Sequence, residues 1–204
     1  MKKIKVGIIG MGVGLKHYHV VKKINYCSIV AICEFDTKKL SSKNIQEKNI
    51  FKTNNYKLLL EKDINLIIIS SYDNFHSQQI IDFVKNGIHV FVEKPLCITK
   101  KEIYKIKRVL KENPHVKFSS NFVLRTKKTF KHLKSIIEKQ KFGKTYYFEG
   151  DYNFGRLEKI TAGWRSKILS YSVMHGGGIH LIDLIMWINN KKIIKVFAEG
   201  NNIS

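Results

Sequence analysis

The chain contains 204 residues, of which 44% are hydrophobic, and it carries a formal net charge of +21. A chain of this length and apolar content can bury the core of one large domain or two small ones, which excludes a disordered protein. No apolar run approaches the ~20 residues that cross a bilayer, and glycines and Lys16 interrupt the stretch where a secretory core would continue. We therefore expect a cytoplasmic protein that does not enter a membrane.

The positive charge has two explanations. A charge of this size favours association with nucleic acid or another polyanion. The lysines, however, are spread through every predicted helix and occur with abundant Ile and Asn, which share A/T-rich codons with Lys. Because no nucleic-acid recognition motif is present, we favour biased genome composition over a polyanion-binding protein, with attraction of anionic ligands as a side effect.

The cysteines give no sign of a disulfide framework or a metal site. Cys27, Cys33 and Cys97 are odd in number and scattered, and they lack the CxxC spacing of zinc sites. We therefore expect three reduced thiols and no bound metal.

The first 121 residues alternate apolar and amphipathic segments. Strands are predicted at 3–9, 28–36, 50–52, 64–71, 88–95 and 115–121, and helices at 10–24, 37–49, 56–62, 76–87 and 99–113. Strands that are apolar throughout, with helices between them, indicate a parallel sheet covered on both faces. The pattern predicts a doubly wound α/β domain of the Rossmann type at 1–120.

The rhythm changes after residue 121. A basic helix is predicted at 126–140, and the aromatic alternation at 145–154 favours an antiparallel strand. A helix at 178–189 and a strand at 193–200 follow. We therefore predict a second, α+β domain at 121–204.

The segment "GIIGMGVG" follows the first strand and opens the first helix, where backbone N–H groups can hold a pyrophosphate. Gly10 permits the tight turn and Gly12 the close approach of phosphates. The third glycine of GxGxxG is replaced by Leu15, while Gly14 stands one place early. Such glycines also serve as simple turn punctuation.

Glu34 supports dinucleotide binding. It ends the second strand about twenty residues after the glycines, where a carboxylate binds the ribose hydroxyls of NAD and repels the 2'-phosphate of NADP. The alternative is a solvated acid before the next helix, with Asp36 as that helix's N-cap. The combination of loop and acid favours NAD.

Seven segments together resemble one family. They are "GIIGMGVG", "VAICEFD", "IIISSYDNFH", "GIHVFVEKP", "NFVLR", "FGKTYYFEGDY" and "GGGIHLIDLIMW", in that order and over essentially the whole chain. Their order resembles the glucose-fructose oxidoreductase, inositol dehydrogenase and MocA family of NAD(P)-dependent oxidoreductases. The resemblance implies an incomplete substrate-binding and dimerisation domain at 121–204, because relatives have a longer C-terminal domain, and homo-oligomers where that domain is complete.

The resemblance implies a catalytic role for Lys94 in the EKP segment, near the nicotinamide and the substrate hydroxyl, with Glu93 beside it at the cofactor. The end of a parallel strand faces the ligand crevice, and Pro95, which is cis in relatives, would fix the backbone there. The alternative is one more surface lysine in a lysine-rich chain.

The resemblance also implies that His180 takes the proton of a sugar hydroxyl as hydride leaves its carbon. Asp183 lies one helical turn further on and is expected to orient this histidine, to contact substrate or to pack under the helix. A packed histidine satisfied by Asp183 is the alternative. Many relatives have an aspartate four residues earlier, where this chain has Gly176, so His175 or Tyr171 is a candidate replacement.

Further residues are placed at the two ligands by the same resemblance. Ser71, His76 and Asn121 are expected at the cofactor, although Ser71-Tyr72 replaces the family's usual Thr-Pro. Arg125 is expected at the substrate. Arg156, Trp164 and Arg165 suit a sugar ring or a phosphate, as in a nucleotide sugar, but an Arg and Trp pair also staples loops.

The sequence therefore predicts an NAD-dependent oxidoreductase acting on a sugar, an inositol or a nucleotide sugar. The main rival is a truncated relative that binds the dinucleotide without a competent substrate site. The polyanion-binding protein is the third hypothesis.

Overall fold

The computed structural model describes residues 3–40, 45, 47, 49–169 and 171–200. The chain forms two compact units, the first made of Met1–Asn121 and Lys159–Tyr171 and the second of Phe122–Glu158 and Ser172–Ser204. The second domain expected at 121–204 is therefore not one continuous stretch. Lys159–Tyr171 packs with the first unit instead.

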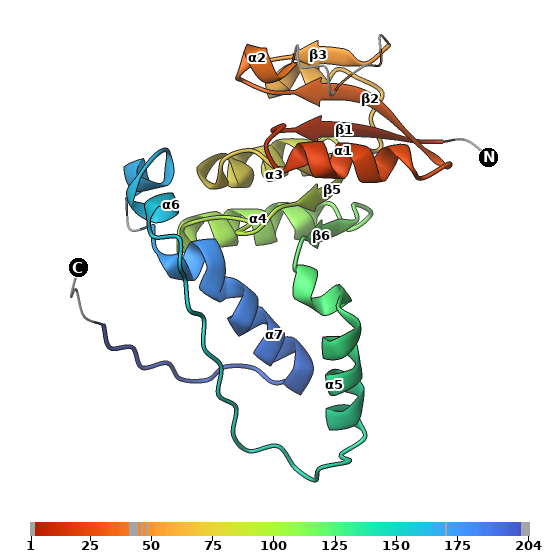
Figure 1. The fold of residues 1–204 in the computed structure, drawn as a ribbon. Coiled ribbons are helices and arrows are strands. Elements are labelled where there is room, and N and C mark those ends of the chain that lie inside the picture. The colour runs from red at the N-terminus through yellow and green to blue at the C-terminus, as the bar shows by residue number, and fades with distance from the viewer. Residues whose placement is uncertain (1–2, 41–44, 46, 48, 170, 201–204) are drawn as a thin grey trace. The chain divides into compact units, whose positions relative to one another are not determined.

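A six-stranded parallel sheet forms the centre of the first unit (Figure 1). Its order is β3-β2-β1-β4-β5-β6, so the chain moves outward from β1 and then returns to start a second half at β4. This reversal confirms the predicted Rossmann arrangement. The strands are β1 (Ile4–Ile9), β2 (Cys27–Cys33), β3 (Phe51–Thr53), β4 (Leu66–Ile69), β5 (His89–Val92) and β6 (Phe118–Ser120).

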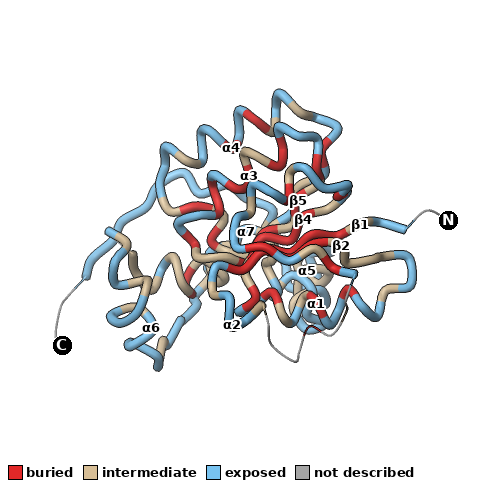
Figure 2. The backbone as a smooth tube through the Cα atoms, turned by 90° about the horizontal axis from the view of Figure 1, so that it is seen from above, coloured by how far each residue is buried: buried red, intermediate tan, exposed pale blue. Residues whose placement is uncertain are grey.

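Helices cover both faces of this sheet (Figure 2). One apolar core contains Ile80 and Phe83 of α3 with Ile106 of α4, packed on the strands, and the other contains Tyr18 and Val21 of α1. Burial on both faces explains why the central strands are apolar throughout. The helices are α1 (Gly14–Lys22), α2 (Thr37–Leu40), α3 (His76–Lys85) and α4 (Lys100–Glu112).

Two predicted helices differ from the structure. The helix expected at 37–49 is described only as α2, and residues 41–44, 46 and 48 lie outside the described part. The segment expected at 56–62 is a 3-10 turn, Tyr56–Leu59, started by the Asn55 side chain, which accepts a hydrogen bond from the backbone N–H of Lys57.

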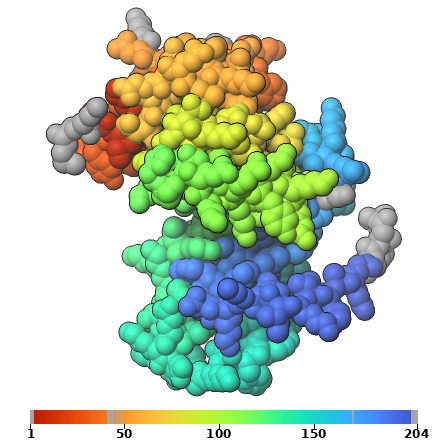
Figure 3. Space-filling model, turned by 180° about the vertical axis from the view of Figure 1, so that it is seen from behind, coloured from red at the N-terminus to blue at the C-terminus, as the bar shows by residue number. Residues whose placement is uncertain are grey.

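A local signal fixes the start of α4. Thr99 accepts a hydrogen bond from the backbone of Glu102, whose side chain accepts one from the backbone of Thr99 in return. This capping box satisfies N–H groups that a helix start leaves without partners. By the colour bar, α4 belongs to the yellow-green to green surface in Figure 3. Lys101, Lys105 and Lys107 of this helix are exposed.

The second unit is built on α5 (Lys128–Glu138) and α7 (Ile179–Asn189), which pack against each other. Lys134 joins the two helices: its Nζ lies 2.5 Å from Glu138 Oε1 and 3.0 Å from the carbonyl oxygen of Trp187. A 3-10 turn (Val123–Thr126) precedes α5, and a π-helical turn (Met174–Gly178) precedes α7.

The strands predicted at 145–154 and 193–200 are wrong. Both segments are irregular, and Tyr146 and Ile194 are 97% and 98% exposed. A strand is stabilised by hydrogen bonds to a neighbour, and the described residues of this unit contain no strand with which either segment pairs.

Candidate functional site

The three glycines of the loop after β1 have different surroundings. Gly10 has φ +82°, and a Cβ at this position would clash with the carbonyl of Ser70. A Cβ on Gly12 would meet nothing within 4 Å, so the space over it is open. A Cβ on Gly14 would lie 3.1 Å from Cγ2 of Ile8, so this glycine lets α1 pack closely on β1. In GxGxxG loops the third glycine allows close packing of helix on strand, and Gly14 performs that role here.

Glu34 joins the end of β2 to this loop. Its side chain is buried, with Oε2 accepting from the backbone N–H of Met11 at 2.5 Å and Oε1 from that of Asp36 at 3.1 Å. Asp36 itself accepts from the backbone N–H of Lys38 at 3.1 Å, as a helix-capping acid does. Capping is thus done by Asp36, and Glu34 retains lone pairs for hydroxyl donors.

A pocket of about 830 Å³ in the first unit joins the loop and the acid. Gly10, Gly12 and Glu34 line it together with Lys94. The open space over Gly12 suits phosphate groups, and the fixed carboxylate of Glu34 suits ribose hydroxyls. These residues fit a nicotinamide dinucleotide. The remaining polar and aromatic lining includes Ser71, Tyr72, Asp73, Glu93, Trp164 and Arg165.

His76 is placed in the interior and not on the pocket lining. It is fully buried, with Nδ1 2.7 Å from the carbonyl oxygen of Pro95 and Nε2 3.1 Å from that of Ser71. The structure therefore makes His76 a brace between the end of β4 and the EKP segment. Ser71 does line the pocket, and its hydroxyl donates to Gln79 Oε1 at 2.6 Å.

Glu93 is held by two side chains. Asn121 donates through Nδ2 to Oε1 at 2.7 Å, and Nε2 of His17 lies 2.7 Å from the same oxygen. Burial tends to raise the pKa of Glu93, but the hydrogen bonds from His17 and Asn121 outweigh it and leave the pKa below its usual value. Asn121 thus acts on Glu93. His17 was missed by sequence reasoning, because nothing in a helical histidine points to a strand 76 residues away.

Lys94 follows Glu93 and lines the pocket before a cis peptide bond to Pro95. The cis bond predicted for this proline is confirmed. Burial lowers the pKa of the Lys94 ammonium, the charges of Asp73 and Glu93 oppose this effect, and Arg165 adds to it. A half-buried ammonium at the end of a strand suits polarisation of a substrate oxygen.

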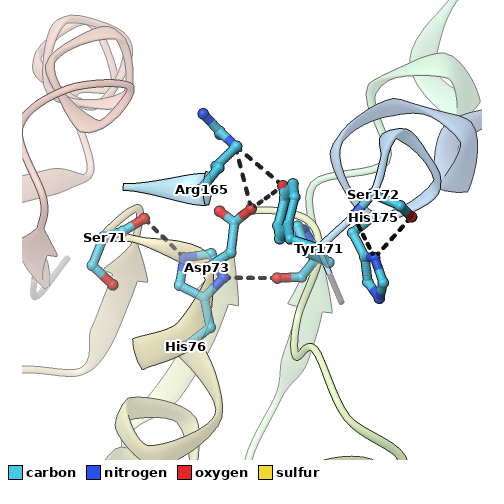
Figure 4. A network of polar contacts seen from close by, with 8 residues as sticks. Ser71, Asp73, His76, Arg165, Tyr171, Ser172 and His175 are labelled. Atoms are coloured by element: carbon cyan, nitrogen blue, oxygen red, sulfur yellow. Dashed lines mark hydrogen bonds and ion pairs between the residues drawn. The ribbon is translucent and has the colours of Figure 1, made fainter. Parts of the chain in front are cut away.

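Asp73 is the second residue that sequence reasoning missed. Its carboxylate is buried and accepts from the hydroxyl of Tyr171 at 2.5 Å, with Nε of Arg165 at 3.9 Å (Figure 4). Burial and the bond to Asp73 raise the pKa of Tyr171 to about 12. Tyr171 therefore stays protonated near neutral pH and lacks the negative charge of the aspartate for which it is a candidate replacement.

Trp164 and Arg165 lie at the dinucleotide pocket of the first unit. Trp164 stacks on Tyr72 with ring centroids 4.5 Å apart and planes at 13°, and the Arg165 guanidinium lies 4.2 Å from the centre of the Trp164 ring. Arg156 belongs to the second unit, where its guanidinium lies 5.9 Å from the Phe154 ring centre. The three residues expected at the substrate are therefore divided between the units.

In the second unit His180 lies half-buried near the start of α7, edge-on to Phe122 with ring centroids 6.2 Å apart. Asp183 forms a forked pair with Arg125, whose Nε and Nη2 donate to Oδ2 and Oδ1 at 2.8 and 2.5 Å. The hydrogen bond to Asp183 raises the pKa of Arg125. Arg125 and Asp183, both expected at the substrate, thus form an ion pair with each other.

The turn before α7 contains the departure from the family pattern. Gly176 lies in the π-helical turn, and Nδ1 of His175 lies 3.2 Å from the hydroxyl oxygen of Ser172 (Figure 4). A Cβ on Gly177 would clash with the ring of Tyr152. A larger residue at Gly177 would therefore require the Tyr152 ring, which is 42% exposed, to move. His175 remains a candidate for the role of the missing acid.

Among the described residues, no group of three or more His, Cys, Asp or Glu side chains is arranged to hold a metal ion. Burial raises the pKa of the Cys33 and Cys97 thiols to about 12 and about 11, with the charges of Glu34 and Glu102 contributing.

In the part of the chain that the structure describes, no helix has the length and apolar character of a membrane span.

Comparisons with known proteins place the chain in a family. Residues 4–122 match the "Oxidoreductase family, NAD-binding Rossmann fold" model, and residues 130–204 match the "GFO/IDH/MocA C-terminal domain". Among curated proteins, the chain is 25% identical over 208 residues to myo-inositol 2-dehydrogenase of Thermotoga maritima, covering 97% of this chain and 58% of that protein.

Solved structures agree. The myo-inositol 2-dehydrogenase of Lactobacillus plantarum has a TM-score of 0.81 and 29% identity, over 93% of this chain and 57% of that one. The scyllo-inositol dehydrogenase of Lactobacillus casei, solved with NAD(H) and scyllo-inositol, has a TM-score of 0.78 and 24% identity, over 94% and 57% of the two chains, and supports the fold alone. The chain thus spans less than two thirds of these relatives. It belongs to the GFO/IDH/MocA oxidoreductase family, and its first unit has that family's NAD-binding Rossmann fold.

Proposed function

We propose that the chain binds NAD(H) and acts as an oxidoreductase on a hydroxyl-bearing carbon of a sugar, an inositol or a nucleotide sugar. The observation that carries this proposal is the single pocket that brings Gly12, Glu34 and Lys94 together in the first unit. The inositol dehydrogenases among the relatives support the substrate class.

Each pocket residue has a distinct task in this proposal. The backbone N–H groups from Gly12 onward bind the phosphates, because those of Gly10 and Met11 already donate to the Cys33 carbonyl and to Glu34. Glu34 binds the hydroxyls of the adenosine ribose. Lys94 donates a hydrogen bond to the substrate oxygen and stabilises charge that develops there. The bound nicotinamide supplies the hydride acceptor or donor.

Proton transfer is assigned to His180 of the second unit. During oxidation its imidazole takes the hydroxyl proton as the carbon loses hydride, and it returns the proton in the reverse direction. The pair of Asp183 with Arg125 contributes by fixing α7 next to the turn that precedes α5. His175 is the candidate for assisting His180 in the absence of the family's aspartate.

Preference for NAD over NADP follows from the setting of Glu34. A buried carboxylate that is already hydrogen-bonded to two backbone N–H groups has little freedom to move away from a 2'-phosphate. Repulsion between the two anions therefore disfavours NADP.

The test is a fluorescence titration of the 204-residue chain with NADH and, separately, with NADPH. We expect tighter binding of NADH, and Glu34→Gln should weaken it by about tenfold while reducing the preference over NADPH. Glu61→Gln, at an exposed acid of the same unit, is the matched control and should change neither. A folded chain that binds neither nucleotide would contradict the proposal.

Activity is tested separately from binding. Formation of NADH from NAD is followed with myo-inositol, simple sugars and a nucleotide sugar, for the original chain and for Lys94→Met and His180→Gln. We expect turnover with at least one substrate and its loss in both variants. Unchanged turnover in Lys94→Met would remove Lys94 from the proposed site.

A second candidate function is dinucleotide binding without turnover. It is favoured by the described residues of the second unit, which contain helices and irregular segments but no strand. The same assays separate the two functions, because this candidate predicts saturable NADH binding with no substrate-dependent NADH formation.

We also propose that a homo-oligomer forms where the C-terminal domain is complete, and that the protein resides in the cytoplasm, where buried thiols such as Cys33 and Cys97 stay reduced. Light scattering of the purified chain checks the first point. A monomer at micromolar concentration would contradict it for this chain.

A further inference from the structure

The two halves of the sheet place a carboxylate at corresponding positions. The first half contains β1, β2 and β3, and the second contains β4, β5 and β6. Glu34 follows β2 and Glu93 follows β5, so each acid ends the middle strand of its half, and both line the pocket. A doubly wound sheet of this order binds a dinucleotide across the junction of its halves, with one mononucleotide on each side. Glu93 therefore occupies, on the nicotinamide side, the position that Glu34 occupies on the adenosine side.

The two acids are held by different kinds of donor. Glu34 is fixed by the backbone N–H groups of Met11 and Asp36, which every substitution except proline preserves. Glu93 depends on the side chains of His17 and Asn121, which meet at the single oxygen Oε1, each at 2.7 Å. The orientation of Glu93 is therefore open to change by mutation, and His17 is one of its two determinants.

His17 reaches Glu93 from the helix that follows the glycine loop. It lies on α1, three residues after Gly14, and its ring packs edge-on against Phe91 of β5 with centroids 5.6 Å apart and planes at 78°. Phe91 and Glu93 are two residues apart, so their side chains leave the extended backbone on the same side. This packing fixes the imidazole plane, and with it the direction in which Nε2 meets the carboxylate.

Burial makes this contact consequential. The side chains of His17 and Glu93 are 18% and 14% exposed, so little water is present to replace a lost partner. A hydrogen bond to a carboxylate in such a setting is stronger than one between neutral groups. Removing His17 would leave Asn121 as the side-chain partner of Glu93, beside the backbone of Lys94, and would loosen the carboxylate.

We propose that His17 is a positioning residue of the dinucleotide site, which holds the Glu93 carboxylate at the pocket so that it accepts hydrogen bonds from the nicotinamide half of the dinucleotide. The inference rests on the proposed NAD(H) binding and adds a residue to it. It gives α1 two tasks: its N-terminus presents N–H groups to the phosphates, and its His17 orients Glu93 at the end of β5.

The experiment compares two ligands on His17→Ala, His17→Gln and the original chain. NADH contains both halves of the dinucleotide, whereas ADP contains only the adenosine half. Dissociation constants for both are measured by calorimetry, after thermal melting has shown that each variant is folded. His19→Ala, at an exposed histidine of the same helix, is the matched control.

We expect His17→Ala to weaken NADH by about tenfold and to leave ADP within about twofold, since only the bond to Glu93 is lost. His17→Gln, whose amide N–H can still donate to Glu93, should recover most of the NADH affinity. His19→Ala should change neither ligand.

Three results would overturn the inference: equal weakening of NADH and ADP, unchanged NADH binding in His17→Ala, or no recovery in His17→Gln. Each of them leaves NADH binding by the original chain intact and so leaves the proposed function standing. Absence of NADH binding by the original chain is the distinct result that removes the proposed function, and this inference with it.

Discussion

The two units differ in how their backbone hydrogen bonds are satisfied. In the first unit, six parallel strands form hydrogen bonds with one another, and an apolar core covers each face of the sheet. In the second, two helices pack together, and the segments around them remain irregular. The contrast teaches that a strand pattern predicts structure only where the pairing strand is also present.

Gly10→Ala should have the largest effect and should be confined to the first unit. A Cβ at φ +82° is strained and would clash with the Ser70 carbonyl, so we expect a loss of roughly 3 kcal/mol in the free energy of unfolding and loss of NADH binding. Urea unfolding, followed by NADH titration, measures both. Gly12→Ala, where the space is open, should keep the stability while weakening NADH; equal destabilisation by the two variants would contradict the assignment.

Asp183→Asn should disturb the second unit alone. It breaks the forked pair with Arg125, which is partly exposed, so solvent screening limits the expected loss to about 1 kcal/mol. Hydrogen exchange should become faster in α7, while NADH binding stays unchanged. Asp151→Asn, at an exposed acid of the same unit, provides the control. A change in NADH affinity would show that the units are coupled.

Asp73→Asn should lower the pKa of Lys94 further. Asp73 and Glu93 now oppose the effects of burial and of Arg165, and removing one negative charge strengthens those effects. The pKa of Lys94 in the folded state lies below the unfolded value of 10.5. Between these two pKa values the folded state binds fewer protons than the unfolded state, so the free energy of unfolding rises with pH across that range. The pH dependence of lysine acetylation, read by mass spectrometry, should move to lower pH at Lys94 and remain unchanged at exposed Lys101.

Thr99→Ala should have a small effect, limited to α4. Loss of the capping box costs about 1 kcal/mol of stability and leaves the pocket intact. Urea unfolding and NADH titration together check this expectation. Glu112→Gln, at the opposite end of the same helix in a loose and exposed ion pair with Arg108, should change stability less. A loss of NADH affinity in Thr99→Ala would show that α4 supports the pocket.

Much of the first unit was predictable because its signals are local. Apolar strands, glycines and caps act within a few residues, so all six strands of the sheet and the glycine loop were predicted. The role of Gly14 depended on its contact with Ile8 across the helix and strand, which no spacing rule contains. The predicted helix at 56–62 was too long because the Asn55 cap starts a 3-10 turn that ends at Leu59.

The site residues were less predictable because their partners are distant in sequence. Glu34 and Lys94 end apolar strands, which is a readable signal, and both line the pocket. His17 and Asp73 act through Glu93 and Tyr171, respectively, over separations of 76 and 98 residues. His76 looked like a ligand contact but is a buried brace, because only the fold shows which carbonyl groups surround it.

The excursion of Lys159–Tyr171 has a consequence for dissecting this protein. A fragment cut after Asn121 would contain every strand of the sheet, yet it would lack Trp164 and Arg165 and therefore one wall of the pocket. In a chimera joined after Asn121, the sheet would come from this protein, but the residues that replace Trp164 and Arg165 at the pocket would come from the other protein. A fragment meant to keep the whole pocket therefore needs Lys159–Tyr171 as well as the strands.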